Sequence, residues 1–561
     1  MKITILSGGT GNNALYKGIK KFYPEADIKV IVNAYDSGKS TGICRKITNT
    51  LGVSDIRKNH SRLYSTIENP NKNYMDFLEG RYSLGINNEE KQVYEKLAYW
   101  NINEQFILDA VKYFFDLYRE HKNKYWFEDF NIANIVYSAL FNKVGYEKTC
   151  ELMTNFLGIE NNVLINSFDN VYIEANTLDG TIIEDEGDIV NHKNANNPIV
   201  KIAYMGDRNG ILNEKAANRI LDSDLIIISS GTFWSSIYPT LDYGNFYLFI
   251  NESKAKKIWI MNNEQDKDAY GVTSNDFIRI VDERGLYLND FTIIENKSAD
   301  PILQLQNNDY DIIREELGNI NGKHNGELVS KCILKQYYNI GKNLIFDFDD
   351  TIWSRKWKED SKFHKVSREN LQLLNELLLN YDITIVSGNS YKSIEDKIKT
   401  VMDIKDFEPS IIADANAVLF EQGEVVDVNK KFVIKQEDID FIKPMLENYG
   451  FNVEVNKNNT YIKIKPIDDK YRKLLSDHLN VLFYYNNLKL KAHITGKTTI
   501  DIVTKNNDKA SLFNTNWISK ESTYIGDEVD NGNDKTISEE CNNFVKVNDV
   551  FETNTLLRLL K

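Results

Sequence analysis

Short apolar runs rich in β-branched residues alternate along this chain with amphipathic stretches. KITIL (2–6) and IKVIVNA (28–34) predict strands, and NNALYKGIKKFY (12–23) predicts a helix between them. Alternation of this kind is typical of βα units that build a parallel sheet. A mainly helical region follows from about residue 60 to 158, where NEQFILDAVKYFFDLYREH has the helical period.

Strand patterns return after this region. They occur at DNVYIEA, IVKIAYM, DLIIISS and KKIWIMN, and a new βα series opens with NLIFDFD (343–349) and ITIVSGN (383–389). The stretch 321–342 between the two series is the predicted domain boundary. We therefore expect an α/β protein with two doubly wound, parallel-sheet (Rossmann-like) domains, at 1–330 and 340–561. Strands and helices mix between about 392 and 490, which predicts an α+β insertion in the second domain.

Composition narrows the class of protein. A chain of 561 residues is too long for one hydrophobic core, and 42% hydrophobic residues suffice for two. The net charge of -14 speaks against a nucleic-acid-binding surface, although backbone amides and a metal can still hold phosphates in an acidic protein. Four scattered cysteines, no signal-peptide core and only short apolar runs predict a cytoplasmic protein without a membrane partner.

The segment NLIFDFDDTIWS (343–354) places three aspartates in four positions at the end of a predicted strand. Asp347 and Asp349 share one side of the strand, because residues i and i+2 face the same way. In open α/β sheets such strand ends face the ligand crevice, and a divalent cation would relieve the crowding of carboxylates. For the aspartates alone, the alternative of a solvated acidic turn is the favoured interpretation.

Three later segments favour the cation. ITIVSGN brings Ser387 to a second strand end, Lys509 follows the strand TTIDIVT, and STYIGDEVDNGNDKT ends a strand with Asp527. Together with the aspartate cluster, these segments resemble the four motifs of the haloacid dehalogenase-like phosphohydrolases, in the same order.

The resemblance implies a role for each residue. Asp347 would be the nucleophile that forms an aspartyl phosphate, and Asp349 the general acid/base. Thr351 and Ser387 would bind phosphoryl oxygens, and Lys509 would offset negative charge. Mg²⁺ would be held by Asp347, Asp349, Asp527 and Asp534. The place of the insertion, with IIADANAVLF, is similar to the phosphomannomutase and sugar-phosphate phosphatase branch, where a cap closes over a small phosphomonoester. The alternative is a degenerate fold kept for structure.

In the first half, ILSGGTGNN (5–13) follows a strand and precedes a helix. Glycines there allow backbone amides to approach a phosphate at a helix N-terminus, although a plain tight turn has the same composition. The segment lacks both the GK[ST] ending of a Walker loop and the GxGxxG pattern, so kinase and dehydrogenase interpretations lose their main support.

A longer series of segments is more specific. The series consists of VNAYDSGKSTGICRK, LGVSDIRKN, FNIANIVYSALF, NTLDGTIIEDEGDI and DLIIISSGTFWSSIYPTL. It resembles the 2-phospho-L-lactate transferase (CofD) family and the related gluconeogenesis factor YvcK over about residues 1–320, and its segments occur in the same order as in that family. The resemblance implies a diphosphate cradle of Gly8, Gly9, Thr10 and Gly11, with a second wall of Ser230, Gly231 and Thr232. Asn33, Asp36 and Asp55 would be metal or nucleotide ligands, or alternatively helix caps.

Two further side chains of this half have alternative interpretations. Trp234 is either a stacking platform for a ring or a buried core residue, and Arg57 either a phosphate partner or part of a surface salt bridge.

Departures from the family pattern leave two functions open for the first half. Ser7 and Ser37 replace a glycine and an acid, and SSGT replaces GPGS. One hypothesis is a transferase that moves a phosphate-bearing group from a nucleoside-diphosphate-activated donor to an alcohol, giving a bifunctional enzyme. The other is a YvcK-like regulatory domain that binds a nucleotide sugar, fused to a sugar-phosphate phosphatase or phosphomutase. Both predict small phosphorylated ligands, and relatives of the first half suggest a homo-oligomer.

Overall fold

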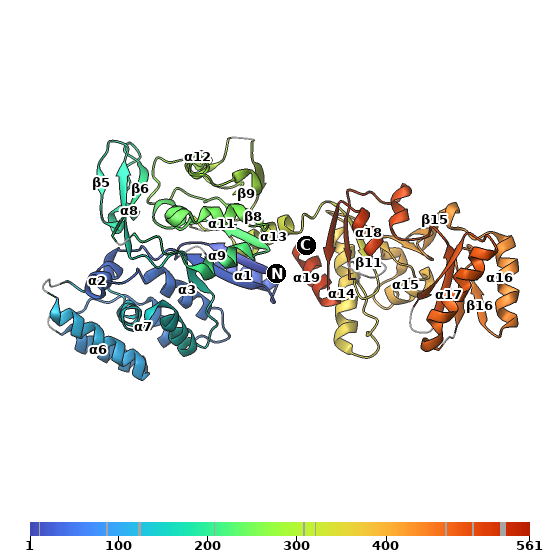
Figure 1. Ribbon diagram of the computed structural model, residues 1–561, viewed down its shortest axis with the longest axis horizontal. Helices are drawn as coiled ribbons and strands as arrows, with labels where there is room; N and C mark the ends of the chain where they lie inside the picture. Colours follow the sequence, from blue (N-terminus) through green and yellow to red (C-terminus); the bar gives the residue numbers. More distant parts are fainter. Residues whose placement is uncertain are drawn as a thin grey trace. The chain divides into compact units, whose positions relative to one another are not determined.

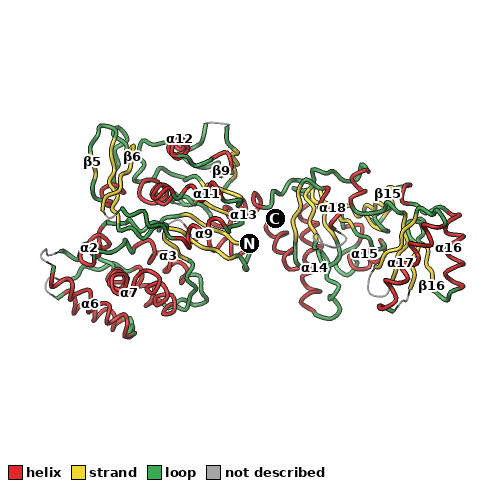
Figure 2. The backbone as a smooth tube through the Cα atoms, in the orientation of Figure 1, coloured by secondary structure: helices red, strands yellow, loops and turns green. Residues whose placement is uncertain are grey.

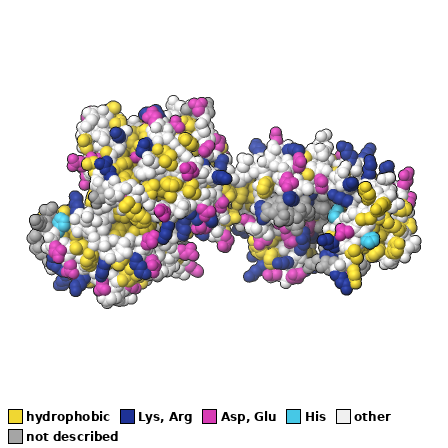
Figure 3. All heavy atoms as spheres, in the orientation of Figure 1, with side chains coloured by type: hydrophobic (Ala, Val, Ile, Leu, Met, Phe, Trp, Pro, Cys, Tyr) yellow, Lys and Arg dark blue, Asp and Glu magenta, His cyan; other side chains and the backbone are white. Residues whose placement is uncertain are grey.

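The computed structural model describes residues 1–9, 12–85, 88–121, 125–206, 208–306, 309–319, 321–465, 468–495, 499–527 and 534–561. These residues form two compact units, Met1–Tyr337 and Tyr338–Lys561 (Figure 1). No helix within these ranges is both long and apolar enough to cross a membrane. On the face drawn in Figure 3, basic side chains are interspersed with acidic ones over both units.

The first unit is built on a seven-stranded sheet with the order β10-β9-β8-β7-β1-β2-β3, in which all neighbours are parallel. Its strands are β1 (Lys2–Leu6), β2 (Asp27–Val32), β3 (Val163–Ile165), β7 (Leu225–Ile228), β8 (Lys256–Ile260), β9 (Phe291–Asn296) and β10 (Asp311–Glu315). The run LIII of β7 is buried throughout, as expected for a central strand covered on both faces. The chain order reverses between β1 and β7, so the carboxyl ends of these two strands define the crevice of the sheet.

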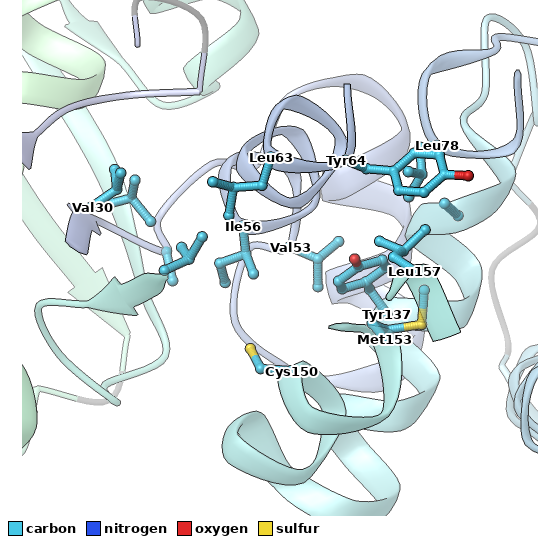
Figure 4. Close-up of a cluster of buried hydrophobic side chains, with 14 of the residues drawn as sticks. Val30, Val53, Ile56, Leu63, Tyr64, Leu78, Tyr137, Cys150, Met153 and Leu157 are labelled. Carbon is cyan, nitrogen blue, oxygen red and sulfur yellow. The ribbon is translucent and has the colours of Figure 1, made fainter. Parts of the chain in front are cut away.

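Helices surround this sheet and form a separate helical layer after β2 (Figure 2). They are α1 (Asn12–Phe22), α2 (Lys39–Thr48), α3 (Ser54–Tyr64), α4 (Lys72–Glu79), α5 (Glu89–Tyr99), α6 (Gln105–Glu120), α7 (Ile132–Leu157), α8 (Glu186–Val190), α9 (Glu214–Leu221), α10 (Tyr238–Asp242), α11 (Tyr247–Glu252), α12 (Ser274–Arg284) and α13 (Gly326–Tyr337). Apolar side chains of α3, such as Ile56 and Leu63, share one buried cluster with Tyr137 and Met153 of α7 (Figure 4). This cluster joins the helical layer to the sheet through Val30 of β2.

Two predicted strands of the first half lie outside the parallel sheet. β4 (Val171–Thr177) and β6 (Ile199–Gly206) pair antiparallel and, with β5 (Ile182–Ile183), form a three-stranded sheet. Along β4, buried and half-buried residues alternate strictly. This period of two is the pattern of a sheet with only one covered face.

The second unit has its own seven-stranded sheet, with the order β15-β14-β13-β12-β11-β20-β21. The strands are β11 (Asn343–Asp347), β12 (Asp382–Val386), β13 (Ser410–Ala413), β14 (Val418–Glu421), β15 (Glu424–Val428), β20 (Thr523–Gly526) and β21 (Asn543–Lys546). β13 to β15 form an antiparallel edge, and the other pairs are parallel. The helices of this layer are α14 (Ser361–Leu377), α15 (Tyr391–Ile398), α18 (Lys535–Glu540) and α19 (Val550–Leu560).

An inserted α+β layer follows β15. Its antiparallel sheet has the order β16-β17-β19-β18, and helices α16 (Gln436–Asn448) and α17 (Asp469–Tyr485) share its apolar core. The strands are β16 (Asn452–Val455), β17 (Ile462–Lys465), β18 (Leu490–Thr495) and β19 (Thr499–Thr504). The layer thus runs to Thr504, whereas β13 to β15, which fall within 392–490, belong to the larger sheet.

Candidate functional site

The glycine turn of the first unit leaves β1 at the crevice of the sheet. Gly8 and Gly9 are enclosed: a Cβ on Gly8 would lie 2.5 Å from Ser236 Oγ, and one on Gly9 would overlap Asp55 Oδ1. Only glycine allows the backbone to run this close to its neighbours. Thr10 and Gly11, predicted for the same cradle, lie outside the described residues.

The second predicted wall follows β7, the strand beside β1. The backbone N–H of Gly231 donates to Asn262 Oδ1 at 3.0 Å, and the hydroxyls of Thr232 and Ser236 are 2.9 Å apart. Ser230 lies in the same turn, half-buried. Gly8 of the predicted cradle and Thr232 of the predicted wall therefore both lie beside the side chain of Ser236.

Asn33, predicted as a ligand, is occupied by contacts within the protein. Its buried amide donates to the carbonyl oxygen of Ser236 at 2.9 Å, and its Oδ1 accepts from the N–H of Tyr35 at 3.1 Å. These bonds tie the end of β2 to the turn that follows β7.

Of the two predicted acids of this half, Asp55 lies beside the glycine turn and Asp36 lies at the start of α2. Asp36 Oδ1 accepts from the N–H of Gly38 at 2.9 Å, and Asp55 Oδ1 lies 3.3 Å from Lys58 Nζ. The carboxylate of Glu186 in α8 interacts electrostatically with both acids. Burial, and then the charges of Asp36 and Asp55, raise the pKa of Glu186 well above its usual value. The NTLDGTIIEDEGDI pattern pointed to this segment, but not to Glu186 itself.

A buried acid that the sequence did not single out supports the turn after β7. Asp268 Oδ2 accepts from both the N–H and the hydroxyl of Ser235 at 2.9 Å. Burial raises the pKa of Asp268 to about 6, partly opposed by these hydrogen bonds. Asp268 thus acts as an internal acceptor for a turn that begins at the crevice.

Two side chains with alternative interpretations are structural. Trp234 is fully buried, with its ring centroid 5.0 Å from that of Phe233, so the core interpretation is confirmed. Arg57 is also buried and donates to Asn134 Oδ1 at 2.8 Å. Its contact with Glu79, at 3.5 Å, is therefore not the surface salt bridge proposed from the sequence.

In the second unit, the ends of β11 and β20 bring a charged cluster together. Lys509 Nζ lies 2.5 Å from Asp347 Oδ1 and also contacts Asp534, and all three side chains are buried. Tyr524 donates to Asp534 at 2.7 Å, and Thr351 donates to Asp527 at 3.0 Å. Residues more than 150 positions apart in the chain thus meet around one point.

The acids of this cluster are arranged as a candidate cation site. One carboxylate oxygen from each of Asp347, Asp527 and Asp534 lies within 4.8 Å of the others. Burial raises the pKa of Asp347 well above its usual value. Burial alone would lower the pKa of Lys509, but the charges of Asp347 and Asp534 outweigh it and raise the pKa.

Asp349 points elsewhere. Its Oδ1 lies 3.0 Å from Lys397 Nζ, while its Oδ2 accepts from the amide of Asn389 and lies 3.5 Å from Ser387 Oγ. Its side chain is therefore not part of the group formed by Asp347, Asp527 and Asp534. Lys397 and Asn389 carried no signal in the sequence, because a lysine on a helix and an asparagine in a turn are commonplace.

The first unit is by its topology and glycine turn a Rossmann-like α/β domain with its crevice at β1 and β7. Residues 3–317 match the family model described as 2-phospho-L-lactate transferase CofD, and the chain belongs to this family.

Among curated relatives, the gluconeogenesis factor of Listeria innocua serovar 6a is 25% identical over 263 residues, which cover 46% of this chain and 66% of the relative. A relative from Thermoanaerobacterium thermosulfurigenes that carries the gluconeogenesis-factor name is 22% identical over 297 residues, 53% of this chain and 78% of the relative.

Two solved structures are each similar to part of the chain. A Bacillus halodurans protein is 19% identical with a TM-score of 0.43, covering 59% of this chain and 98% of that protein. A haloacid dehalogenase-like hydrolase from Bacteroides thetaiotaomicron is 12% identical with a TM-score of 0.29, covering 39% of this chain and 98% of that one.

Proposed function

We propose that the second unit is a Mg²⁺-dependent phosphomonoesterase that works through an aspartyl phosphate on Asp347. The observation that carries the proposal is the meeting of Asp347, Asp527 and Asp534 with Lys509 at the carboxyl end of a parallel sheet. Phosphoryl transfer requires mainly positioning and the neutralisation of charge, which a buried lysine among carboxylates supplies.

The donor set fits a divalent cation. Three carboxylates with one lysine leave an excess of negative charge in a largely buried place, and hard oxygen ligands are those that Mg²⁺ prefers. Asp347, Asp527 and Asp534 would hold it, and when bound it would neutralise the charge of the phosphoryl oxygens.

The protein residues then have distinct tasks in the reaction. An oxygen of Asp347 attacks phosphorus, and the bond to the leaving oxygen breaks as that oxygen takes the proton of Asp349. Water next attacks the phosphorus of the aspartyl phosphate and gives its proton to Asp349, which frees inorganic phosphate and the Asp347 carboxylate. Ser387 donates a hydrogen bond to a phosphoryl oxygen, Thr351 does the same once its hydroxyl turns away from Asp527, and Lys509 offsets the charge on Asp347.

A phosphate-release screen of sugar and nucleotide monophosphates tests this function. The wild-type protein should hydrolyse part of the panel in Mg²⁺, and Asp347→Asn should not. Asp382→Asn, at the exposed start of β12, is the matched control and should retain the activity. Activity that survives in Asp347→Asn would show that another residue is the nucleophile.

For the first unit, we propose a CofD-like transferase that uses a nucleoside-diphosphate-activated donor and releases a nucleoside monophosphate. Family membership and the enclosed glycine turn at the crevice support it. Asp36, Asp55 and Glu186 would hold a divalent cation on the diphosphate. Together the two units would form a bifunctional enzyme acting on consecutive phosphorylated metabolites.

The second candidate for this unit is a nucleotide-sugar-binding regulator. The gluconeogenesis-factor name of the relatives, and the serines at positions 7 and 37, favour it. Thermal-shift measurements on the whole protein, with nucleotide sugars and nucleoside-diphosphate esters, separate the candidates. Binding with release of nucleoside monophosphate supports the transferase, and binding without turnover supports the regulator.

A further inference from the structure

Lys397 is a charged side chain that the reaction described above does not use. It projects from α15, its side chain is 16% exposed, and its ammonium lies 3.0 Å from Asp349 Oδ1. The same ammonium lies 4.8 Å from the ring centroid of Phe348, which is fully buried. A lysine normally keeps considerable rotamer freedom in water, so its confinement between a ring and a carboxylate fixes both partners.

The helix that carries Lys397 is itself anchored. Asp414 accepts from the N–H of Tyr391 at the first turn of α15, at 2.8 Å, and the Tyr391 ring stacks on Phe420 with centroids 3.9 Å apart. Ile394 and Ile398 are buried beneath the helix. Lys397 therefore meets Asp349 from a rigid support rather than from a loose surface helix.

Asn389 holds the other oxygen of the same carboxylate. Its side-chain amide donates to Asp349 Oδ2, its backbone N–H donates to Ser387 Oγ at 3.1 Å, and its carbonyl accepts from the N–H of Asp414 at 2.8 Å. Asp349 thus contacts the charged ammonium of Lys397 through Oδ1 and accepts a hydrogen bond from the neutral amide of Asn389 through Oδ2. Each carboxylate oxygen has a second lone pair, so either can still exchange a proton with a reacting group.

We propose that Lys397 is a positioning residue for general acid/base catalysis by Asp349, an inference that rests on the phosphomonoesterase function. Lys397 fixes the orientation of the carboxyl group and offsets the negative charge that appears on it once the leaving oxygen has taken its proton. The ion pair of Lys397 is with Asp349, not with the nucleophile Asp347. The contribution of Lys397 to the rate therefore increases with the basicity of the leaving oxygen, because a more basic oxygen has a greater requirement for a proton.

The test compares two leaving groups in one sample of full-length protein. The alkyl probe is the sugar phosphate that the wild type hydrolyses fastest, because its alkoxide must be protonated. The aryl probe is p-nitrophenyl phosphate, whose nitrophenolate leaves as an anion. For Lys397→Met we expect kcat on the alkyl probe to fall about tenfold or more, since general acid catalysis contributes about 10²–10⁴-fold. On the aryl probe kcat should change by less than about threefold, with KM unchanged on both. The ratio of the two rates does not depend on how much of the variant is folded.

Lys399→Met is the matched control, at the C-cap position of the same helix. Lys399 is exposed and pairs with Glu395 at 2.6 Å, so its removal takes the same charge from α15 without touching Asp349, and the ratio should stay at the wild-type value. Equal losses on the two probes in Lys397→Met, or an equal shift of the ratio in Lys399→Met, would overturn the positioning role while leaving the phosphatase intact. Absence of hydrolysis of every ester by the wild type would overturn the phosphatase, and this role with it.

Discussion

The two units place their candidate sites at the same part of the fold, the carboxyl ends of parallel strands, but build them from opposite materials. The first site is mostly backbone: glycines pressed against Ser236 and Asp55, with acids beside them. The second is mostly charge: a buried lysine between carboxylates from two separate segments. A backbone cradle suits binding of a phosphate group, whereas a charge cluster suits chemistry on one. The comparison shows that similar topology does not determine function, which depends instead on the residues at the strand ends.

The largest effect is expected from removing the ammonium group of Lys509 at the second site. Lys509→Met removes the positive charge between the buried Asp347 and Asp534, and breaking such a buried pair costs about 3–5 kcal/mol of unfolding free energy. Thermal unfolding should show this loss, and Mg²⁺ should raise the Tm of the variant more than that of the wild type, because the cation replaces the missing charge. Lys520→Met, which removes an exposed pair with Glu540, should leave Tm nearly unchanged. A variant as stable as the wild type would contradict the cluster.

The first site should break at a backbone position. Gly9→Ala introduces a Cβ that overlaps Asp55 Oδ1, and overpacking of this kind costs about 1–3 kcal/mol. We expect weaker nucleotide binding, measured by calorimetry, with phosphate release by the second unit unchanged. Gly341→Ala is the control, because its Cβ would meet nothing closer than 4.0 Å. If Gly9→Ala loses both nucleotide binding and phosphate release, the two sites are not independent.

The acids beside the glycine turn sharpen the comparison, because they decide whether the first site also uses a cation. If Asp36, Asp55 and Glu186 hold Mg²⁺, nucleotide affinity should fall about tenfold on chelation. Glu186→Gln should then bind nucleotide with little dependence on Mg²⁺, while Glu184→Gln, at an exposed position of the same segment, should behave as the wild type. If the wild type binds nucleotide with equal affinity with and without Mg²⁺, the first site does not use the cation.

The smallest effect concerns pH. Because the pKa of Asp268 is raised to about 6 in the folded protein, its neutral form stabilises the fold at low pH. This contribution is complete below about pH 4 and is lost as pH rises through about 6, a change of ~3 kcal/mol for two pKa units. The Tm difference between the wild type and Asp268→Asn should therefore decrease from pH 4.5 to pH 7. A difference that is constant or grows with pH would contradict the assignment.

Much of the fold follows from local pattern. The run KITIL predicts β1 with the bounds that the structure has, because its β-branched and apolar residues 3–6 suit a strand buried on both faces. β4 and β6 show the limit: their alternation identifies strands, but the sheet that receives them depends on pairing between distant segments. The inserted layer likewise extends to β19, whereas the sequence pattern assigns this strand, TTIDIVT, to the motif that carries Lys509.

The candidate sites divide in the same way. Asp347 and Lys509 could be proposed from motifs, because their order along the chain carries the signal. Glu186, Asp268 and Lys397 could not, because each acquires its role only from a partner that folding brings near. A carboxylate on a short helix or a lysine on a surface-patterned helix has no local feature that distinguishes it.

The most direct test of the central claim is to trap the covalent intermediate. The wild-type protein, quenched during turnover of the best ester and treated with borohydride, should carry homoserine in place of the phosphorylated aspartate, and peptide mass spectrometry should locate it at residue 347. Homoserine at another position, or turnover without any reduced aspartate, would contradict the account.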